Sequence, residues 1–197
     1  MAAPTDSAAG DPTLGIILAG GHSRRLGQDK ATVAIPGGTP LGVAIHAVSA
    51  AGLRPVVIGR LAMTDFPAVA SHPDDVANGG PAAGIATGLR LAAGNAIVVV
   101  PCDLPALTAE WLAWLITTWR ELGRPVALAP TTAGKIHPIP GLYTPAVAPA
   151  LEPGRGLYRL FSRPGMATVP MPTTWSQVLE DIDTPDDLAR HRERKTP

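Results

Sequence analysis

Short continuous apolar runs alternate along this chain with segments of helical spacing, and this alternation limits the fold more than any other feature. Residues 14–20 (LGIILAG), 55–59 (PVVIG) and 96–100 (AIVVV) are rich in Leu, Ile and Val and have no alternating polar face. Such runs are typical of strands buried on both faces, which occur in parallel sheets. We therefore expect one α/β domain with a mostly parallel central sheet and helices on both faces.

Four segments have helical spacing, and their first residues suit helix starts. Pro81 would lie in a first turn, where its missing N–H costs nothing. Thr108 is expected to cap a helix whose positive end suits the carboxylate of Glu110. Thr184 is expected to cap the last helix, ahead of Pro185. Helices are thus predicted at 41–51, at 81–93, after Thr108 and after Thr184, with further strands at 125–130 and 138–144.

The two ends of the chain differ in composition from the rest. Residues 1–13 are rich in Ala, Pro, Ser, Thr and Asp, so we expect a disordered leader there. Residues 14–190 contain the predicted strands and helices with no linker to divide them, which indicates a single domain. Residues 191–197 are basic, and we expect a frayed tail.

Charge and cysteine content argue against several classes of protein. The formal net charge is +0 over 197 residues, whereas broad binding of nucleic acid or membranes needs a basic surface. Cys102 is the only cysteine, so no disulfide can form within the chain. No apolar run reaches the ~18 residues of a membrane span, and no signal peptide is recognised. We expect a cytoplasmic protein without nucleic-acid or membrane partners.

The loop after the first predicted strand has the composition of a phosphate-binding loop. It reads LAGGHSRRLGQDKA over residues 18–31. Gly20 and Gly21 let the backbone approach a ligand, and Arg24, Arg25 and Lys30 add positive charge. The spacing matches neither a Walker A motif nor GxGxxG. From the residues alone, a surface turn with solvated charges is the alternative to a nucleotide site.

Three aspartates fall beyond the carboxyl ends of predicted strands, where parallel sheets bind ligands. Asp103 offers the carboxylate oxygens that Mg²⁺ prefers, although the start of the next helix would use the same residue type. Asp74 or Asp75 is a candidate for a ribose hydroxyl or a base edge, with an Asx turn as the alternative. Cys102 is interpreted as a small buried hydrophobe. The five scattered histidines show no zinc spacing.

Together these motifs resemble the molybdenum cofactor guanylyltransferases and their MobA-like nucleotidyltransferase relatives. The segments DD…GGPAAGI, VVPCDLP, HPIPGLY and DIDTPDDL are similar to family motifs in the same order, and the resemblance runs from Leu14 to about Arg190. The opening loop is similar to the family signature LAGGxSxRxGxDK at Leu18, Ala19, Gly20, Gly21, Ser23, Arg25, Gly27, Asp29 and Lys30.

The resemblance implies a Rossmann-like nucleotidyltransferase domain with a defined reaction. Family members transfer GMP from GTP to the phosphate of molybdopterin, use Mg²⁺ and release pyrophosphate. The second glycine of LAGG, Gly21, is similar to guanylyl enzymes, because cytidylyl relatives tend to have LAAG. The resemblance also implies molybdoenzyme apoproteins or their chaperones as downstream partners.

Site residues follow from the resemblance by position. Leu18, Ala19 and Gly20 would contact the guanine and sugar, and Lys30 the phosphates. Asp103 would hold the metal ion and touch GTP. Asp74 would lie near the nucleoside, with Asp75 as the fallback. The catalytic candidates are Arg25, Lys30 and Asp103, and the nucleotide-binding candidates are Leu18, Ala19, Gly20, Gly21, Lys30, Asp74 and Asp103.

Two departures from the family pattern concern ligand contacts. Where the family often has an asparagine after the second strand, this chain has Gly59. The paired asparagines of the motif NxNTP, associated with the pterin side, are Asp181 and Asp183 here. Two added carboxylates would repel an anionic acceptor, and DIDTP also occurs in relatives with other substrates.

The acceptor is expected over the second half of the chain. The cationic candidates include three arginines on one predicted helical face, for which a solvated face is the alternative. Other readings are a transferase for CTP or another phosphorylated acceptor, a non-catalytic nucleotide-binding regulatory module, and a dinucleotide-dependent oxidoreductase. The acceptor candidates are Lys135, His137, Arg155, Arg159 and Arg163.

Overall fold

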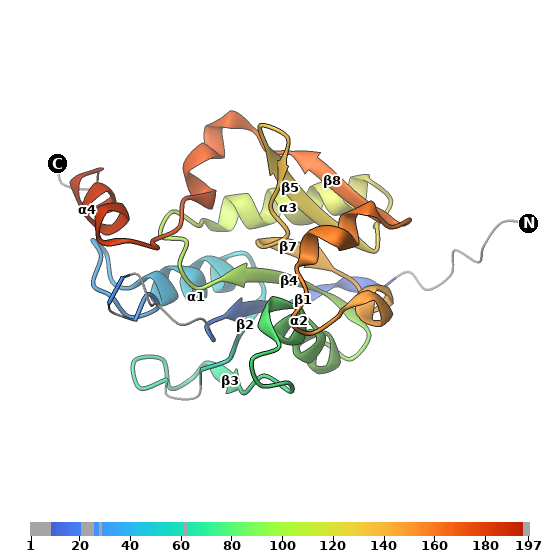
Figure 1. Ribbon diagram of the computed structural model, residues 1–197, viewed down its shortest axis with the longest axis horizontal. Coiled ribbons are helices and arrows are strands. Elements are labelled where there is room, and N and C mark those ends of the chain that lie inside the picture. Colours follow the sequence, from blue (N-terminus) through green and yellow to red (C-terminus); the bar gives the residue numbers. More distant parts are fainter. Residues whose placement is uncertain (1–8, 21–25, 28, 61–62, 195–197) are drawn as a thin grey trace, which may run out of the picture.

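The structure is a computed structural model that describes residues 9–20, 26–27, 29–60 and 63–194. Eight strands form one sheet in the order β3-β2-β1-β4-β7-β5-β6, with β8 beside β5 (Figure 1). The strands are β1 (Gly10–Leu18), β2 (Arg54–Ile58), β3 (Ala70–His72), β4 (Asn95–Pro101), β5 (Ala127–Thr132), β6 (Lys135–Ile136), β7 (Gly141–Tyr143) and β8 (Met166–Pro170).

Parallel pairing dominates the sheet, as the buried apolar runs predict. β1 pairs in parallel with β2 and β4, β2 with β3, and β5 with β8. β7 is antiparallel to both β4 and β5, and β6 is antiparallel to β5. Only antiparallel neighbours can be joined by a short turn, and β5, β6 and β7 follow one another closely in sequence. The expected α/β fold with a mostly parallel sheet is confirmed.

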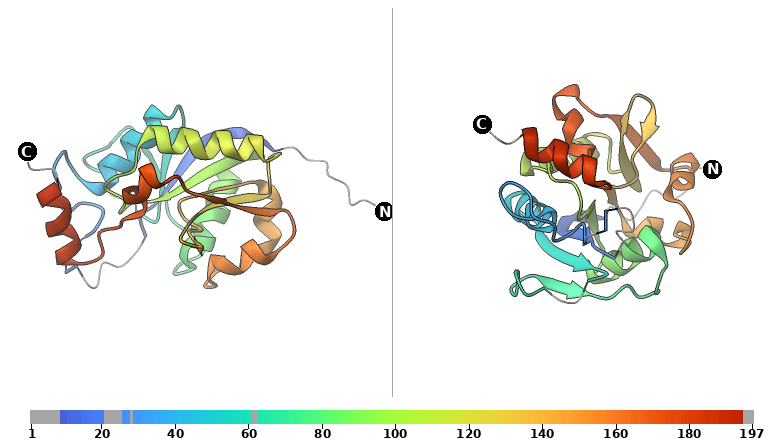
Figure 2. Two further views of the ribbon diagram at one scale, coloured as in Figure 1. Left: turned by 90° about the horizontal axis from the view of Figure 1, so that it is seen from above. Right: turned by 60° about the vertical axis from the view of Figure 1, so that its left-hand side comes forward.

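Helices cover both faces of the sheet, as predicted (Figure 2). Neighbouring residues of a buried strand point to opposite faces, so Ile17 and Val98 pack with α1 and α3, while Ile16 and Val99 pack with α2. The helices are α1 (Pro40–Ala50), α2 (Gly80–Leu91), α3 (Ala109–Glu121) and α4 (Pro185–Arg194), and the 3₁₀ helices are η1 (Pro145–Ala150), η2 (Leu157–Ser162) and η3 (Thr173–Leu179).

The threonines predicted to cap two of the helices do so in the structure. The Thr108 hydroxyl accepts the N–H of Trp111 at 3.3 Å and caps α3. The Thr184 hydroxyl accepts the N–H of Asp187 at 3.2 Å, and the Asp187 carboxylate accepts the N–H of Thr184 at 2.8 Å. This reciprocal pair is a capping box and fixes where α4 begins. Within the described ranges, no helix is both long and apolar enough to cross a membrane.

Both end segments predicted from composition overlap with regular elements of the structure. Residues 10–13, expected in a disordered leader, belong to β1, because Gly10 pairs with Asn95 of β4 and Asp11 forms an ion pair with Arg120 at 3.1 Å. Residues 191–194, expected in a frayed tail, belong to α4. Arg192 donates a hydrogen bond to the carbonyl oxygen of Ala34 at 2.8 Å, which ties this last turn to the body of the domain.

The strand predicted at 138–144 is wrong in its first half. Only Gly141–Tyr143 pairs with the sheet, as β7. Residues 137–140 are irregular and lie between β6 and β7, and Pro138 and Pro140 have no N–H for a ladder hydrogen bond. Sequence reasoning also missed β3, β6 and β8, which have no long apolar run.

Candidate active site

A cleft of about 710 Å³ opens at the carboxyl ends of β1, β2 and β4. The chain continues from β1 to β2 on one side, while β4 pairs with the other side of β1. Ligands of open α/β sheets bind at such a reversal of strand order. The walls come from the ends of these strands, the loop around Lys30, the start of α2, residues 137–140 and the segment before α4.

The backbone after β1 is in close contact with the backbone after β2. The Ala19 N–H donates to the carbonyl oxygen of Ile58 at 2.8 Å. Gly59 has φ of 90°, and a Cβ there would lie 2.6 Å from Cα of Gly20. A Cβ on Gly20 would in turn lie 3.3 Å from Oδ2 of Asp74. With this backbone, no side chain fits at Gly59 between the two loops.

Asp74 presents a carboxylate oxygen that has no donor. Its Oδ1 is buried, and no described group donates a hydrogen bond to it. Burial, together with the neighbouring charge of Asp75, raises the pKa of Asp74 above its ordinary value. Leaving a buried acceptor unsatisfied costs free energy. Because Asp74 lines the cleft, the N–H or O–H of a ligand can satisfy it.

The carboxylate of Asp75 pairs with Arg90 instead of lining the cleft. Its two oxygens accept hydrogen bonds from Nη2 and Nε of Arg90, each at 2.9 Å. Its backbone N–H donates to the hydroxyl of Thr87 at 3.2 Å. These contacts hold the pKa of Asp75 below its ordinary value, the hydrogen bond with Arg90 first among them. Of the two aspartates, Asp74 lines the cleft and Asp75 does not.

Lys30 extends to the carboxyl end of β4. Its Nζ lies 3.2 Å from Oδ2 of Asp103 and also donates to Oδ1 of Asp183. The Lys30 side chain is 23% exposed and that of Asp103 is 15% exposed. Burial by itself lowers the pKa of Lys30, but the hydrogen bonds and charges of Asp183 and Asp103 outweigh it and raise the pKa. Lys30 is therefore an ammonium ion at neutral pH.

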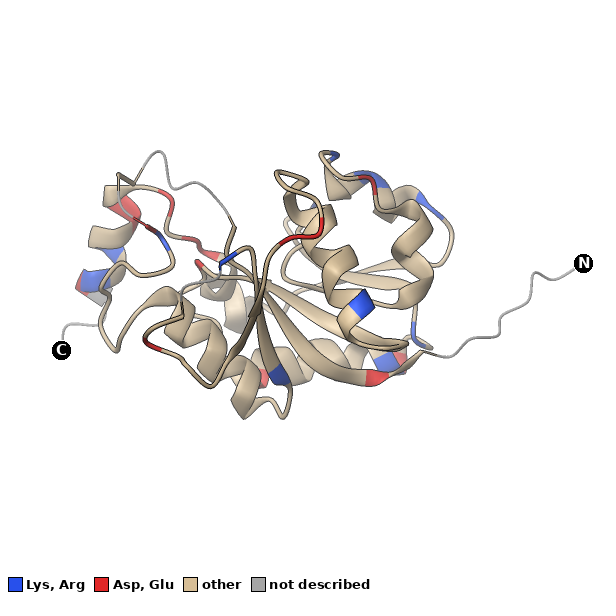
Figure 3. Cartoon of the chain, turned by 90° about the horizontal axis from the view of Figure 1, so that it is seen from below, with Lys and Arg blue, Asp and Glu red and all other residues tan. Residues whose placement is uncertain are grey.

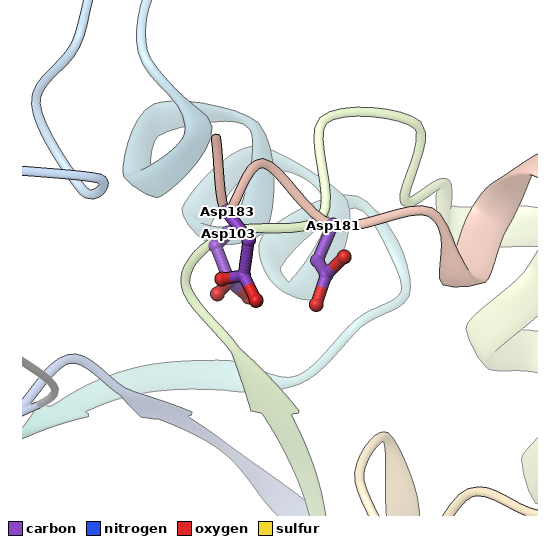
Figure 4. A group of neighbouring side chains, drawn as sticks. All are labelled: Asp103, Asp181 and Asp183. Carbon is purple, nitrogen blue, oxygen red and sulfur yellow. The ribbon is translucent and has the colours of Figure 1, made fainter. Parts of the chain in front are cut away.

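Asp103, Asp181 and Asp183 form one carboxylate cluster, and their side chains point to the same side (Figure 4). Each offers an oxygen, and these oxygens lie within 4.8 Å of one another. Burial and the charges of Asp183 and Asp103 raise the pKa of Asp181. Several carboxylate oxygens in one place are the donor set of a hard divalent cation. The cluster could therefore hold a metal ion, for which the sequence assigned Asp103 alone.

The segment before α4 positions this cluster. The N–H of Ile182 donates to the carbonyl oxygen of Asp103 at 3.2 Å, and the N–H of Asp183 donates to Oδ2 of Asp187 at 3.1 Å. Ile182 is 1% exposed. It packs in a small apolar cluster with Leu26, Val33, Ile35 and Leu188. The start of α4 is thus attached both to the end of β4 and to the loop that carries Lys30.

Asp29 also belongs to the network around this loop. Its Oδ1 accepts the N–H of Ala31 at 3.0 Å, and Oδ2 accepts a hydrogen bond from Arg60. Burial raises the pKa of Asp29, but Arg60 and the N–H of Ala31 outweigh it, so the pKa is lowered. Asp29 fixes the turn that contains Lys30, and Arg60 connects Asp29 to the end of β2.

The predicted acceptor residues divide into two groups. Lys135 and His137 line the cleft. The three arginines line a separate hollow of about 100 Å³ and do not join Lys135 and His137 in the cleft. The predicted helical face is wrong, because η2 spans only residues 157–162. Two of these arginines have an acidic neighbour: Nε of Arg155 and Nη2 of Arg163 each lie 3.6 Å from a carboxylate oxygen of Glu152. Figure 3 shows that acidic and basic segments are interspersed along the chain.

Cys102 is unsuited to nucleophilic chemistry. It is 9% exposed and forms no disulfide. Burial, with a smaller effect from the charge of Asp103, raises the pKa of its thiol to about 12. The thiolate is the reactive form of cysteine, and such a thiol is neutral at pH 7. The interpretation of Cys102 as a buried hydrophobe agrees with this placement.

The structure brings most of the predicted nucleotide residues to one cleft. Gly21 and Arg25 lie outside the described residues. Sequence reasoning missed Asn78 and Tyr158 in the cleft wall, since both lie in irregular segments without a recognisable motif. The predicted residues that line the cleft are Leu18, Ala19, Gly20, Lys30, Asp74 and Asp103.

Comparison with known proteins places the chain in a family. Residues 15–165 match the MobA-like NTP transferase domain. The chain belongs to this family. A probable molybdenum cofactor guanylyltransferase of Rhodopirellula baltica is 31% identical over 197 residues, which cover 92% of each chain. The prediction of a MobA-like nucleotidyltransferase is thereby confirmed.

Solved structures support the fold of this MobA-like domain. A molybdopterin-guanine dinucleotide biosynthesis protein A of Archaeoglobus fulgidus has a TM-score of 0.77 at 24% identity, covering 91% of this chain and 97% of that one. A Mycobacterium tuberculosis protein solved with manganese has a TM-score of 0.65 at 20% identity, covering 94% of this chain and 100% of that one. At these identities the likeness concerns the fold alone.

Proposed function

We propose that this MobA-like protein transfers GMP from GTP to the phosphate of molybdopterin and releases pyrophosphate. The family supplies the reaction class, and the name of the Rhodopirellula relative supports the acceptor. The observation that carries the proposal is one cleft holding the Lys30–Asp103 pair, with Asp74 lining the same cleft. Such a cleft offers a cation for phosphates, carboxylates for a metal ion and an acceptor for a nucleoside.

Asp74 is the group that we assign to the guanine base. Its buried Oδ1 needs a hydrogen-bond donor. Guanine presents an imino N–H beside an exocyclic NH₂, which match the two oxygens of one carboxylate. Cytosine presents an amino group beside an acceptor nitrogen, which a carboxylate repels. The placement of Asp74 therefore favours GTP over CTP.

The carboxylate cluster is the place that we assign to Mg²⁺. Asp103 is the ligand expected from the sequence, and Asp181 and Asp183 contribute oxygens within reach of the same ion. The manganese found with the Mycobacterium relative supports divalent-cation binding in this fold. When bound, Mg²⁺ supplies positive charge that stabilises the phosphates of the nucleotide during transfer.

The reaction needs no covalent intermediate with the protein. The acceptor phosphate is largely dianionic at neutral pH, since its second pKa is near 6. One of its oxygens forms a bond to the α-phosphorus while the bond to the bridging oxygen breaks and pyrophosphate leaves. The protein orients the two phosphates and neutralises the departing charge. We assign this neutralisation to Lys30 and, by position in the motif, to Arg25.

The acceptor side of the cleft is assigned to Lys135 and His137. Thr132 Oγ1 lies 2.6 Å from Nε2 of His137. Burial, together with the charge of Lys135, lowers the pKa of His137, so His137 is neutral at pH 7 and acts as a hydrogen-bonding group. Lys135 then supplies positive charge to this wall. A divalent cation held by the carboxylate cluster would offset the negative charge that Asp183 presents to an anionic acceptor.

An Asp74→Asn variant tests the base assignment. Loss of charged hydrogen bonds is worth about 1.5–3 kcal/mol, so we expect GTP to bind at least about tenfold more weakly, with CTP affinity changed less than about threefold. Titration calorimetry with Mg²⁺ measures both. The pKa of Asp74 is raised, and protonation removes the charge that binds guanine. The GTP affinity of the unaltered protein should therefore fall as the pH drops through the pKa of Asp74, and the variant should lack this fall.

Asp75→Asn is the matched control, because it removes the same charge one residue away from the cleft lining. We expect it to leave both affinities within about twofold. If Asp74→Asn weakened GTP and CTP equally, Asp74 would contact the ribose, and the argument for guanine would be wrong.

A further inference from the structure

The ammonium group of Lys30 lies inside the carboxylate cluster. Its Nζ is 3.2 Å from Oδ2 of Asp103 and donates to Oδ1 of Asp183. These two aspartates, with Asp181, are the donor set assigned above to the divalent cation. An ammonium group that contacts two of these carboxylates and a metal ion held by the same carboxylates would repel each other at short distance, so the two cations compete for the cluster.

The carboxylates are carried on short side chains, whereas the ammonium group of Lys30 ends a long one. The backbone of the cluster is fixed by the hydrogen bonds from Ile182 to Asp103 and from Asp183 to Asp187. Lys30 has a flexible four-carbon stem whose ammonium group can reorient. When a divalent cation arrives, the group that can move is therefore the side chain of Lys30.

The charges in the cluster favour such an exchange. Three carboxylates face one ammonium group, so the net charge of these four side chains is −2 when all are ionised. A divalent cation neutralises this charge better than a single ammonium ion does. Lys30 also lines the cleft, so a displaced ammonium group remains within the space that we assign to the phosphates.

We propose that Lys30 occupies the cation position of the nucleotide-free protein, and that a divalent cation displaces it toward the phosphates of the bound nucleotide. This inference rests on the metal position of the proposed function. It gives Lys30 two roles: it compensates the charges of Asp103 and Asp183 before the cation binds, and it pairs with phosphate afterwards. Cation binding and phosphate binding are thereby coupled through one side chain.

The exchange predicts that removing Lys30 tightens cation binding. We would measure Mn²⁺ affinity of the full chain without nucleotide, from the electron paramagnetic resonance signal of free Mn²⁺. Lys30→Met keeps most of the stem and removes the ammonium group. We expect its Mn²⁺ affinity to rise at least about tenfold, which is about 1.4 kcal/mol. The same Mn²⁺ concentration should then raise Tm more in the variant than in the unaltered protein.

Lys135→Met is the matched control, since it removes the same charge from the same cleft. We expect it to change Mn²⁺ affinity less than about twofold. The proposal is overturned if Lys30→Met binds Mn²⁺ no more tightly than the unaltered protein, if Lys135→Met tightens binding equally, or if no variant binds Mn²⁺. Lys30→Gln takes the place of Lys30→Met if the latter does not fold. No nucleotide or acceptor is present, so failure here leaves the test of GTP with Asp74→Asn intact.

Discussion

Replacing Asp103 by alanine is expected to lower kcat for nucleotidyl transfer at least about a hundredfold, or about 2.7 kcal/mol of transition-state stabilisation. Asp103 lies at the carboxyl end of β4, its carboxylate contacts Lys30, and it belongs to the cluster that could hold a metal ion. Its loss removes the proposed metal ligand and also frees Lys30 from one of its contacts. Steady-state pyrophosphate release with saturating GTP measures the effect.

Asp75→Ala is the control for Asp103→Ala. It removes a carboxylate from the loop that precedes α2, but the Asp75 side chain pairs with Arg90 and does not line the cleft. We expect kcat to stay within about twofold. Turnover of Asp103→Ala close to that of the unaltered protein, with the fold intact by circular dichroism, would remove Asp103 from the mechanism.

Gly59→Ala is expected to damage both the fold and the nucleotide site. Positive φ costs a non-glycine residue about 1–2 kcal/mol. The added Cβ would also lie 2.6 Å from Cα and 2.7 Å from the backbone nitrogen of Gly20. Backbone cannot move aside as a flexible side chain can, so the loop after β1 must shift. We expect KM for GTP to rise at least about tenfold, with a clear loss of stability in urea denaturation.

Gly52→Ala is the control that separates the cost of a positive φ from the clash with Gly20. Gly52 has φ of 80°, but a Cβ there has no atom within 4 Å. It should therefore lose about 1–2 kcal/mol of stability and keep its KM for GTP. Equal stability losses in the two variants, with unchanged KM in both, would contradict the close contact between Gly20 and Gly59.

The elements predicted correctly are those whose signal is local. The apolar runs of β1, β2 and β4 are long enough to identify buried strands, and the capping residues Thr108 and Thr184 mark α3 and α4. The short strands β3, β6 and β8 have no comparable run. β3 and β8 are strands because a neighbour offers a free edge, as β5 does for β8, and that information is tertiary. β6 instead forms a short hairpin with β5.

The site shows the same division between local and tertiary information. The motif around Lys30 and the strand-end position of Asp103 are visible in the sequence. The partner of Lys30 at Asp183 is 153 residues away, so this pair is not visible in the sequence, where the resemblance associates Asp183 with the pterin side. At Gly59 the resemblance indicates only the absence of an asparagine, and the structure adds that a side chain there would strike Gly20. Spacing along the chain encodes neither contact.

Pyrophosphate release with Mg²⁺ and purified molybdopterin, compared across GTP, CTP and ATP, tests the central claim most directly. We predict release with GTP and none above background with CTP or ATP, and no release when molybdopterin is omitted. Release with CTP alone would contradict the assignment of guanine to Asp74. If GTP bound but released no pyrophosphate, the acceptor would be wrong, and the carboxylates of Asp181 and Asp183 would be the first groups to re-examine.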